Sequence, residues 1–212
     1  KGVAGLDMIG LAQKGGAVVS HLKLAPDPAG TGSPRLTHGG ADLVIAADLV
    51  VAAGPTVIPL MRHGRTRIVL NTEQTTTGHF IHNPDLEFPA QRLEKDIEGA
   101  VGKLAMHPLD ATRLAERLLG DAIAANALLL GHAWQLGLLP LQRESILHAI
   151  ELNNVAVDLN REAFEWGRYA AHDPDAVARY AGLETQACEQ TLDDMIAQRT
   201  SFLLAYQDRA YA

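Results

Sequence analysis

The sequence predicts an α/β fold: a mostly parallel, Rossmann-like sheet with flanking helices, followed by a helical C-terminal extension. Two short apolar runs, residues 43–47 and 67–71, suit strands that are buried on both faces, as in a parallel sheet. Strand, helix and strand fit within about 30 residues here, which indicates a βαβ unit. In the second half of the chain, apolar residues recur at helical spacing instead.

The first third of the chain is expected to form strands and loops. Residues 17–24 end in an alternation of apolar and polar residues, which predicts a half-buried strand. Prolines and glycines in residues 26–34 interrupt regular structure. Asp48 is a plausible N-cap for a helix over residues 49–62, which two internal prolines should leave irregular or broken.

A polar loop, residues 72–78, follows the strand at residues 67–71. Ligand sites in open α/β sheets favour the carboxyl ends of strands, so this loop is a candidate binding region. Residues 91–101 are then expected to form a helix, and residues 103–106 a strand.

The second half is predicted to be helical. Asp110 is a plausible N-cap for a helix that runs to about Leu136, where Gly137 and Pro140 mark its end. Further helical segments are expected over residues 143–151, 155–170, 176–180 and 185–211. We therefore divide the chain into a domain over residues 1–170 and a helical tail over residues 171–212.

Composition and charge exclude several classes of function. The chain has 212 residues, a formal net charge of −7 and one cysteine, Cys188. A nucleic-acid or anionic-membrane partner is not expected at this charge. No disulfide can form within the chain, and an iron–sulfur cluster needs about four thiolates. One cysteine is compatible with a reducing cytoplasm, where we expect the protein. The chain begins without methionine or a signal peptide, which suggests that it starts inside a longer one.

The most function-like local pattern is the glycine stretch at residues 10–16. Its glycines let backbone amides approach an anion, and Lys14 adds positive charge. The lysine precedes the pair Gly15 and Gly16, so the stretch is neither a phosphate-binding P-loop nor a dinucleotide fingerprint. The alternative is a tight turn that leads into the strand at residues 17–24.

The nine histidines do not form a recognisable metal-binding pattern. His79 and His82 lie three apart in strand-like sequence and should point to opposite faces. His132 and His148 belong to different predicted helices and have no carboxylates at ligand spacing. We expect no metal site, and no catalytic nucleophile, since no nucleophile elbow is present.

Two polar residues in helical sequence leave alternatives open. Asn126 interrupts an apolar stripe, and we favour a buried hydrogen bond that fixes helix packing over contact with a ligand. Arg168 could pair with a carboxylate of a partner, but an ordinary helix charge is the preferred interpretation.

Several segments together resemble the gamma-type domain of the 2-oxoacid:ferredoxin oxidoreductases, in the indolepyruvate form. The longest is GLAQKGGAVVSHL at residues 10–22. The resemblance covers roughly residues 1–170 and includes residues 41–43 (ADL), 48–53 (DLVVAA), 65–67 (RTR), 71–72, 77–78, 83–85 (NPD), 120–126 (GDAIAAN), 131–135 (GHAWQ), 137–141 (GLLPL), 149–153 (AIELN), Asn160 and 163–168 (AFEWGR). In the family a glycine-rich strand, turn and helix precede the region that begins here at Lys1, so we expect the sheet to lack a leading strand.

The resemblance implies an oxidative decarboxylation of an arylpyruvate with coenzyme A. Thiamine diphosphate would supply the carbanion chemistry and iron–sulfur clusters would carry electrons to ferredoxin. The resemblance also implies that these cofactors belong to other domains, which would be this chain's partners in an oligomeric enzyme. This domain would then assist assembly and contribute contacts to coenzyme A or to neighbouring domains. The candidates for those contacts are Gln13, Lys14, Gly15, Gly16, His21, Asn71, Thr72 and Gly78, and none is expected to be a chemical catalyst.

Three other interpretations remain open at this stage. The domain could be a non-catalytic scaffold whose glycine-rich surface only packs against neighbours. The same enzyme class could act on another 2-oxoacid. Finally, the chain could be an independent α/β enzyme, although the sequence offers no convergent set of titratable groups.

Overall fold

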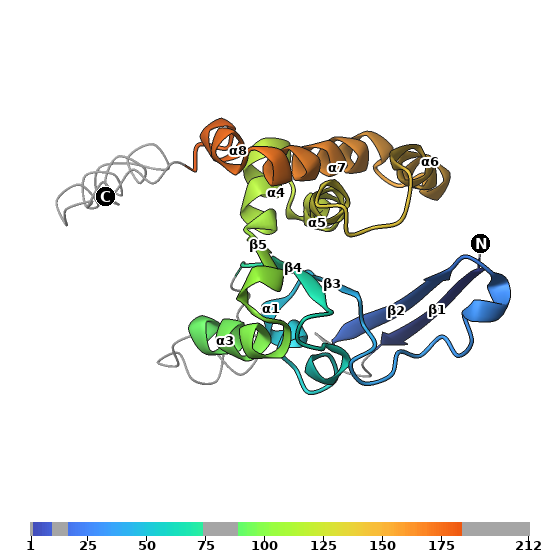
Figure 1. The fold of residues 1–212 in the computed structure, drawn as a ribbon. Helices are drawn as coiled ribbons and strands as arrows, with labels where there is room; N and C mark the ends of the chain where they lie inside the picture. Colours follow the sequence, from blue (N-terminus) through green and yellow to red (C-terminus); the bar gives the residue numbers. More distant parts are fainter. Residues whose placement is uncertain (1, 10–16, 74–88, 184–212) are drawn as a thin grey trace, which may run out of the picture. The chain divides into compact units, whose positions relative to one another are not determined.

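The computed structural model describes residues 2–9, 17–73 and 89–183. Residues 1–181 form one compact unit and residues 182–212 form a second one. The account below concerns the first unit, which is drawn in Figure 1. The predicted boundary at residue 170 stays a prediction, and the helix predicted over residues 185–211 lies outside the described residues.

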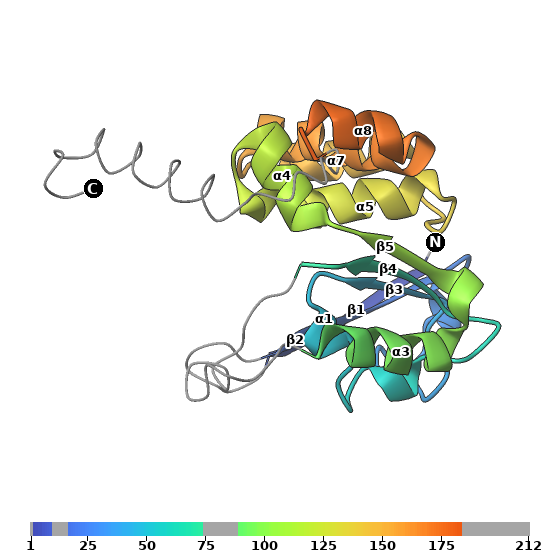
Figure 2. The same ribbon diagram turned by 90° about the vertical axis from the view of Figure 1, so that its left-hand side faces the viewer.

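A three-stranded parallel sheet forms the centre of the unit. Its strands are β3 (Leu43–Ala46), β4 (Arg67–Asn71) and β5 (Met106–Leu109), in the order β3-β4-β5. Figures 1 and 2 show α1 (Leu49–Ala52) and α3 (Ala90–Val101) on one face of this sheet. Figure 2 shows α5 (Ala125–Gln135) and α7 (Val157–His172) on the other face, so that the predicted α/β fold is confirmed.

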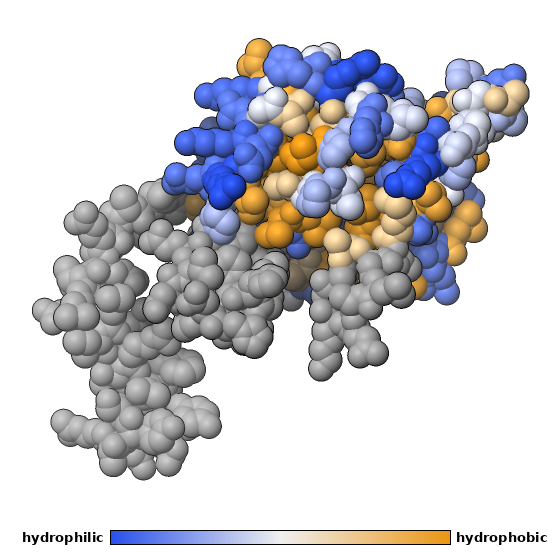
Figure 3. All heavy atoms as spheres, turned by 90° about the horizontal axis from the view of Figure 1, so that it is seen from below, coloured by the Kyte–Doolittle hydropathy of each residue, from blue (hydrophilic) through white to orange (hydrophobic). Residues whose placement is uncertain are grey.

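The face toward α1 and α3 is packed as an apolar core. Ile68 and Leu70 of β4 and Ile97 of α3 are each 0% exposed in this cluster. Val19 of β2 (Val18–Ala25) also packs against it and so connects the N-terminal strands with the sheet. Viewed from the α3 side, Figure 3 shows apolar side chains that reach the surface in the middle of this face.

The N-terminal part forms a separate antiparallel hairpin. Strand β1 (Gly2–Ile9) pairs with β2 (Val18–Ala25), in a register that places Val3 opposite Leu24. The strand predicted at residues 17–24 is thus confirmed, whereas β1 was not foreseen. In a half-buried strand the apolar side chains usually face the interior. In β2 the opposite holds, because the polar His21 is 3% exposed and Leu22, on the other face, is 58% exposed.

The second half consists of helices, as predicted. They are α4 (Ala111–Leu119), α5 (Ala125–Gln135), α6 (Arg143–Asn153), α7 (Val157–His172) and α8 (Pro174–Tyr180). The single helix predicted from Asp110 to Leu136 is wrong, since α4 ends at Gly120, which has a left-handed φ of 77°. A short 3₁₀ turn, Ala122–Ala124, then leads into α5.

Two further boundaries differ from the prediction. The helix expected over residues 49–62 is only one turn long, because Pro55 and Pro59 lack the N–H groups that a continuing helix needs. Asp48 does cap this turn, as expected, by accepting from the Val51 N–H at 2.9 Å. The strand expected at residues 103–106 is a 3₁₀ turn, Lys103–Ala105, and β5 begins at Met106. Pro108 lies inside β5, where an edge strand tolerates proline.

Candidate functional site

The buried side-chain amide of Asn71 forms hydrogen bonds at the carboxyl ends of the parallel strands. Its Nδ2 donates to the Ala47 carbonyl oxygen at 3.1 Å and to the Thr112 hydroxyl at 2.8 Å. Its Oδ1 accepts the Ala111 N–H at 3.0 Å, at the first residue of α4. Because Asn71 is 3% exposed and engaged at both ends of its amide, it connects β3, β4 and α4 from inside the protein.

The backbone of the next residue, Thr72, forms a hydrogen bond at the same end of the sheet. Its N–H donates to the Leu109 carbonyl oxygen at 3.0 Å and so extends the pairing of β4 with β5. The remainder of the polar loop, including the candidate Gly78, lies outside the described residues. The same holds for Gln13, Lys14, Gly15 and Gly16, and for His79, His82 and Cys188.

A concave feature lies along β3, and we call it the edge cavity. Its volume is about 640 Å³, within the range of small-molecule and peptide sites, roughly 300–1,000 Å³. It is lined by Ala17, Val18, Val19, Ser20, His21, Leu36, Ala41, residues 43–48, Val51, Ala52, Val57, Leu60 and Asn126. The lining reaches the carboxyl end of β3, where ligand sites of open α/β sheets are expected.

His21 is the most unusual residue of the edge cavity. Its Nδ1 accepts the Leu36 N–H at 3.0 Å. A ring nitrogen that accepts a hydrogen bond carries no proton, so in the neutral ring the proton sits on Nε2. That Nε2 is buried and has no hydrogen-bond partner among the described residues. Buried polar groups are normally paired, so this nitrogen is an exception among the described residues.

Asn126 also lines the edge cavity, and its predicted role is wrong. The buried hydrogen bond expected for it does not form, because Asn126 is exposed at the start of α5. The apolar stripe to which it was assigned runs through the break at Gly120, so the assumed helical spacing does not apply there.

Arg168 pairs within its own domain. Its Nε donates to Gln135 Oε1 at 3.1 Å, and its guanidinium lies 4.9 Å from the ring centroid of Trp134. It also forms an ion pair with Glu165, which in turn accepts from Arg143 at 2.6 Å. These contacts join α5, α6 and α7 at the surface.

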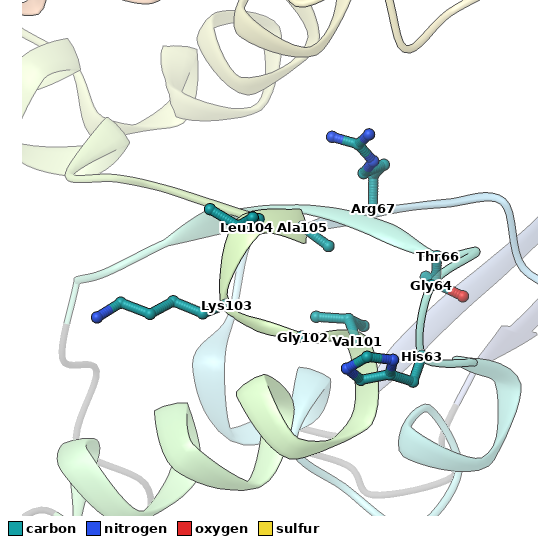
Figure 4. A pocket seen from close by; sticks show the side chains of 9 residues that line it. All are labelled: His63, Gly64, Thr66, Arg67, Val101, Gly102, Lys103, Leu104 and Ala105. Atoms are coloured by element: carbon teal, nitrogen blue, oxygen red, sulfur yellow. The ribbon is translucent and has the colours of Figure 1, made fainter.

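A smaller cavity of about 290 Å³ lies at the opposite end of the sheet, near Thr66 and Ala105. His63, Arg67 and Lys103 contribute to its lining, which suggests an anion site at first sight. Figure 4 shows, however, that the side chains of Arg67 and Lys103 point away from His63 and from each other. The three basic groups do not converge and cannot bind one anion together.

Two histidines, the buried His132 and the half-buried His107, lie between the sheet and α5. Burial lowers the pKa of His132 on α5, and the charge of His107 adds to this effect, while the Gly167 backbone acts in the opposite direction. Burial, and then the charge of Arg67, also lowers the pKa of His107 on β5. His107 Nε2 and His132 Nδ1 have no hydrogen-bond partner among the described residues. Both lowered pKa values favour the neutral form of the ring in the folded protein.

The described residues do not form a site for a metal ion. Among them, no three His, Cys, Asp or Glu side chains gather in a way that could hold one. Iron–sulfur clusters usually take four cysteines, and the whole chain has one. A diphosphate held through Mg²⁺ also needs carboxylate ligands, and the described carboxylates offer no such group.

Sequence reasoning missed most of the edge cavity. Its walls come from β2, β3, α1 and the start of α5, which are distant in the chain. Of the three candidates that the structure describes, His21 lies in this lining, and Asn71 and Thr72 do not. The apolar run of β3 predicted a strand buried on both faces, and this is wrong for Ile45, which is 39% exposed.

Comparison with known proteins gives one family. The sequence model described as pyruvate ferredoxin/flavodoxin oxidoreductase matches residues 1–170. No curated protein matches the chain in sequence. Among the described helices, none combines the length and apolar character needed to cross a membrane.

Proposed function

Because the chain belongs to the pyruvate ferredoxin/flavodoxin oxidoreductase family, we propose that it is an assembly domain of a 2-oxoacid:ferredoxin oxidoreductase. Enzymes of this family use thiamine diphosphate and iron–sulfur clusters. The single cysteine of the chain cannot hold an iron–sulfur cluster, and the described residues offer no carboxylate group for a magnesium-bound diphosphate, which supports the proposal that other domains hold both groups. The domain then contributes docking surfaces and no chemical catalyst.

The observation that carries this assembly role is the exposed face of the β1–β2 hairpin. Val3, Val18, Leu22 and Leu24 lie on one face of it and are 65%, 60%, 58% and 38% exposed. Asp7 and Ser20 lie opposite each other on the same face, between Leu22 and Val18. A two-stranded sheet is marginally stable by itself, and exposed apolar side chains on one of its faces favour a surface that another protein covers. Neighbouring domains of the enzyme are the natural partners of this face.

The substrate that we propose is indolepyruvate, on the strength of the motifs that resemble the indolepyruvate form. One 2-oxoacid and one coenzyme A would give the acyl-CoA and carbon dioxide, and two electrons would pass to two one-electron ferredoxins. An aryl-acetyl-CoA would be the product. We also propose a cytoplasmic location and an oligomeric enzyme.

Contact with coenzyme A is the second candidate role. Lys14 can pair with a phosphate group, and Gly15 and Gly16 allow backbone amides to approach it. Gln13 could add a hydrogen bond. His21, by contrast, is buried, and Asn71 is engaged inside the protein, so these two support a structural role.

The complete enzyme tests both roles. We would compare the wild type with Lys14→Ala for indolepyruvate- and coenzyme-A-dependent reduction of ferredoxin. Lys103→Ala, a change at an exposed lysine on the 3₁₀ turn before β5, is the matched control. A raised KM for coenzyme A in Lys14→Ala alone supports the contact. Unchanged kinetics with weaker assembly supports the scaffold role.

Two outcomes would contradict the proposal. Absence of activity with any 2-oxoacid would remove the assigned reaction, whatever the fold. Full activity of this 212-residue chain without other domains would exclude the assembly role. Activity with pyruvate but not with indolepyruvate would correct the substrate and leave the assembly role in place.

A further inference from the structure

The exposed residues of the β1–β2 hairpin that the structure describes lie on one face. Side chains alternate between two faces along a strand, and exposure alternates with them in β1 and β2. On the other face, His21 is 3% exposed and Val19 packs against the apolar core. The exposed face consists of three cross-strand pairs, Val3 with Leu24, Gly5 with Leu22 and Asp7 with Ser20, and of Val18 beside them.

Gly5 occupies the middle of this face without a reason among the described residues. Glycine weakens a strand, and within a strand it often marks the close approach of another backbone or a ligand. Gly5 does not have a left-handed φ, and the nearest atom to a Cβ built on it is the His21 carbonyl oxygen at 3.9 Å, an ordinary contact. At Gly2, in the same strand, a Cβ would lie 2.6 Å from the Pro28 Cα. The domain therefore requires glycine at residue 2, whereas the described residues give no such requirement at residue 5.

Asp7 is the charged residue among the described ones on this face. Its cross-strand neighbour is Ser20, and the apolar Leu22 and Val18 are 58% and 60% exposed on either side of Ser20. The salt bridges formed among the described residues do not include Asp7. Burying a carboxylate is unfavourable unless a cation pairs with it. A protein that covers the apolar residues of this face must therefore bring a positive charge to Asp7.

A second copy of the chain does not supply that charge. Two copies related by a twofold axis would present the same face to each other. The described residues of this face include no lysine or arginine, so two Asp7 carboxylates would enter one contact. Like charges across an interface are strongly unfavourable. The charge of Asp7 therefore favours a different polypeptide surface as the partner.

Arginine is the cation that fits this position best. Its planar guanidinium binds a carboxylate through two parallel hydrogen bonds and stacks on aromatic groups at the same time. Gly5 and Asp7 are two residues apart on β1, which corresponds to about 7 Å at roughly 3.4 Å per residue. The space over Gly5 suits a large apolar side chain, because such anchors fill gaps at the centre of interfaces. A matching surface thus carries an apolar side chain and an arginine about 7 Å apart.

We propose that a neighbouring domain of the parent enzyme docks on this face with one arginine paired to Asp7 and one large apolar side chain packed over Gly5. Leu22 and Val18 are covered in the same contact. The inference rests on the proposed assembly role and adds the chemistry by which the partner is recognised. Asp7 and Gly5 are then the specificity-determining residues of the hairpin, while its apolar side chains supply the buried area.

Hydrogen exchange measures this contact in the complete enzyme. The β1–β2 amides of the wild type should exchange at least about 10-fold more slowly in the enzyme than in the separate 212-residue chain, because docking stabilises the hairpin. Equal exchange in both would overturn the inference. Slow exchange in the separate chain that depends on its concentration would indicate a second copy and would overturn it as well.

Gly5→Val is the first variant. A β-branched side chain favours a strand, so the separate chain should melt at the same temperature as the wild type or at a higher one. In the enzyme the valine fills the space over residue 5 and should remove most of the protection of the hairpin. Gly99→Ala in α3, where a Cβ also meets open space, is the matched control and should keep that protection. A destabilised chain, or protection that survives Gly5→Val, would contradict the role assigned to Gly5.

Asp7→Asn decides the charge of the partner surface. If the partner brought no cation, loss of a buried charge would strengthen docking and increase the protection. With an arginine opposite Asp7, we expect the protection of the hairpin in the enzyme to fall by at least about 5-fold. Asp96→Asn, at an exposed carboxylate of α3, is the matched control and should leave it unchanged. Unchanged or increased protection in Asp7→Asn would refute the proposed ion pair.

Leu22→Lys separates this inference from the proposed function. If Leu22→Lys leaves the protection intact, the hairpin face is not an assembly surface and both proposals fail. If it removes the protection while Gly5→Val and Asp7→Asn do not, the assembly role stands and recognition through Gly5 and Asp7 is wrong. These measurements need no substrate, so failure of the assigned reaction would be recognised separately.

Discussion

Gly131 of α5 and Gly167 of α7 mark the place where these two helices meet backbone to backbone. A Cβ built on Gly131 would lie 2.0 Å from the Phe164 carbonyl oxygen, and one on Gly167 would lie 1.9 Å from the Leu128 carbonyl oxygen. Neither backbone can move aside as a flexible side chain could. The close contact of α5 with α7 therefore depends on hydrogen at both positions.

We expect Gly131→Ala and Gly167→Ala each to lower the free energy of unfolding by about 3 kcal/mol, because overpacking forces the helices apart. Chemical denaturation of the chain measures this. Gly99→Ala is the matched control, since Gly99 lies in α3 with nothing within 4 Å of its Cβ position. The free energy of unfolding of this control should rise by about 0.5–1 kcal/mol, because alanine has the higher helix propensity. A loss at Gly99 as large as at Gly131 would refute the proposed cause.

Asn71→Ala should destabilise the fold without a selective effect on coenzyme A. It leaves the buried Ala111 N–H and the Ala47 carbonyl oxygen without their partner, at a cost of about 2–3 kcal/mol. Thr72→Ala keeps its backbone hydrogen bond to Leu109 and should change stability by less than about 0.5 kcal/mol. Thermal unfolding measures the structural role of Asn71, and the KM for coenzyme A measures a role in binding. A raised KM with unchanged stability would contradict the structural role of Asn71.

Acid should weaken the fold through His107 and His132. Burial lowers the pKa of both in the folded state, while an unfolded histidine titrates near about 6.5. As the pH falls below the unfolded pKa, the unfolded chain binds more protons than the folded one. The stabilisation is therefore complete above the unfolded pKa and is lost as the pH falls toward the lower folded pKa. Urea denaturation between pH 8 and pH 5 tests this.

The comparison variant for the acid effect is His132→Gln, which removes the titrating group from the interior. Its unfolding free energy should depend less on pH in the same window than that of the wild type. If the two dependences coincide, His132 does not contribute to acid sensitivity.

Leu22→Lys should impair assembly of the enzyme but not the stability of the chain. Leu22 is 58% exposed on the apolar face of the hairpin, so a lysine there stays solvated in the separate chain but would be buried against a neighbouring domain. Leu104→Lys is the control, because Leu104 is 92% exposed on the turn before β5. Sedimentation of the enzyme should show a loss of assembled species for Leu22→Lys alone. Equal losses would show that the hairpin face has no special role.

Local chemistry explains which elements were predictable. The apolar runs of β3 and β4 and the cap at Asp48 depend on neighbouring residues only. The helix α8 has a clear start signal in Asp173 followed by Pro174. Predictions failed where one residue redirects the chain, as at Gly120, or where a proline hides a strand, as at Pro108 in β5.

The sequence by itself determined the α/β class, the βαβ unit and the family, because periodicity, caps and motifs are properties of short segments. Tertiary structure decided which face of β2 is covered, since alternation defines two faces without saying which one is buried. It also decided that Asn71 connects three elements and that Asn126 opens onto a cavity. The edge cavity and the crossing at Gly131 and Gly167 depend on residues far apart in the chain. Their contacts are set by packing, which no local pattern encodes.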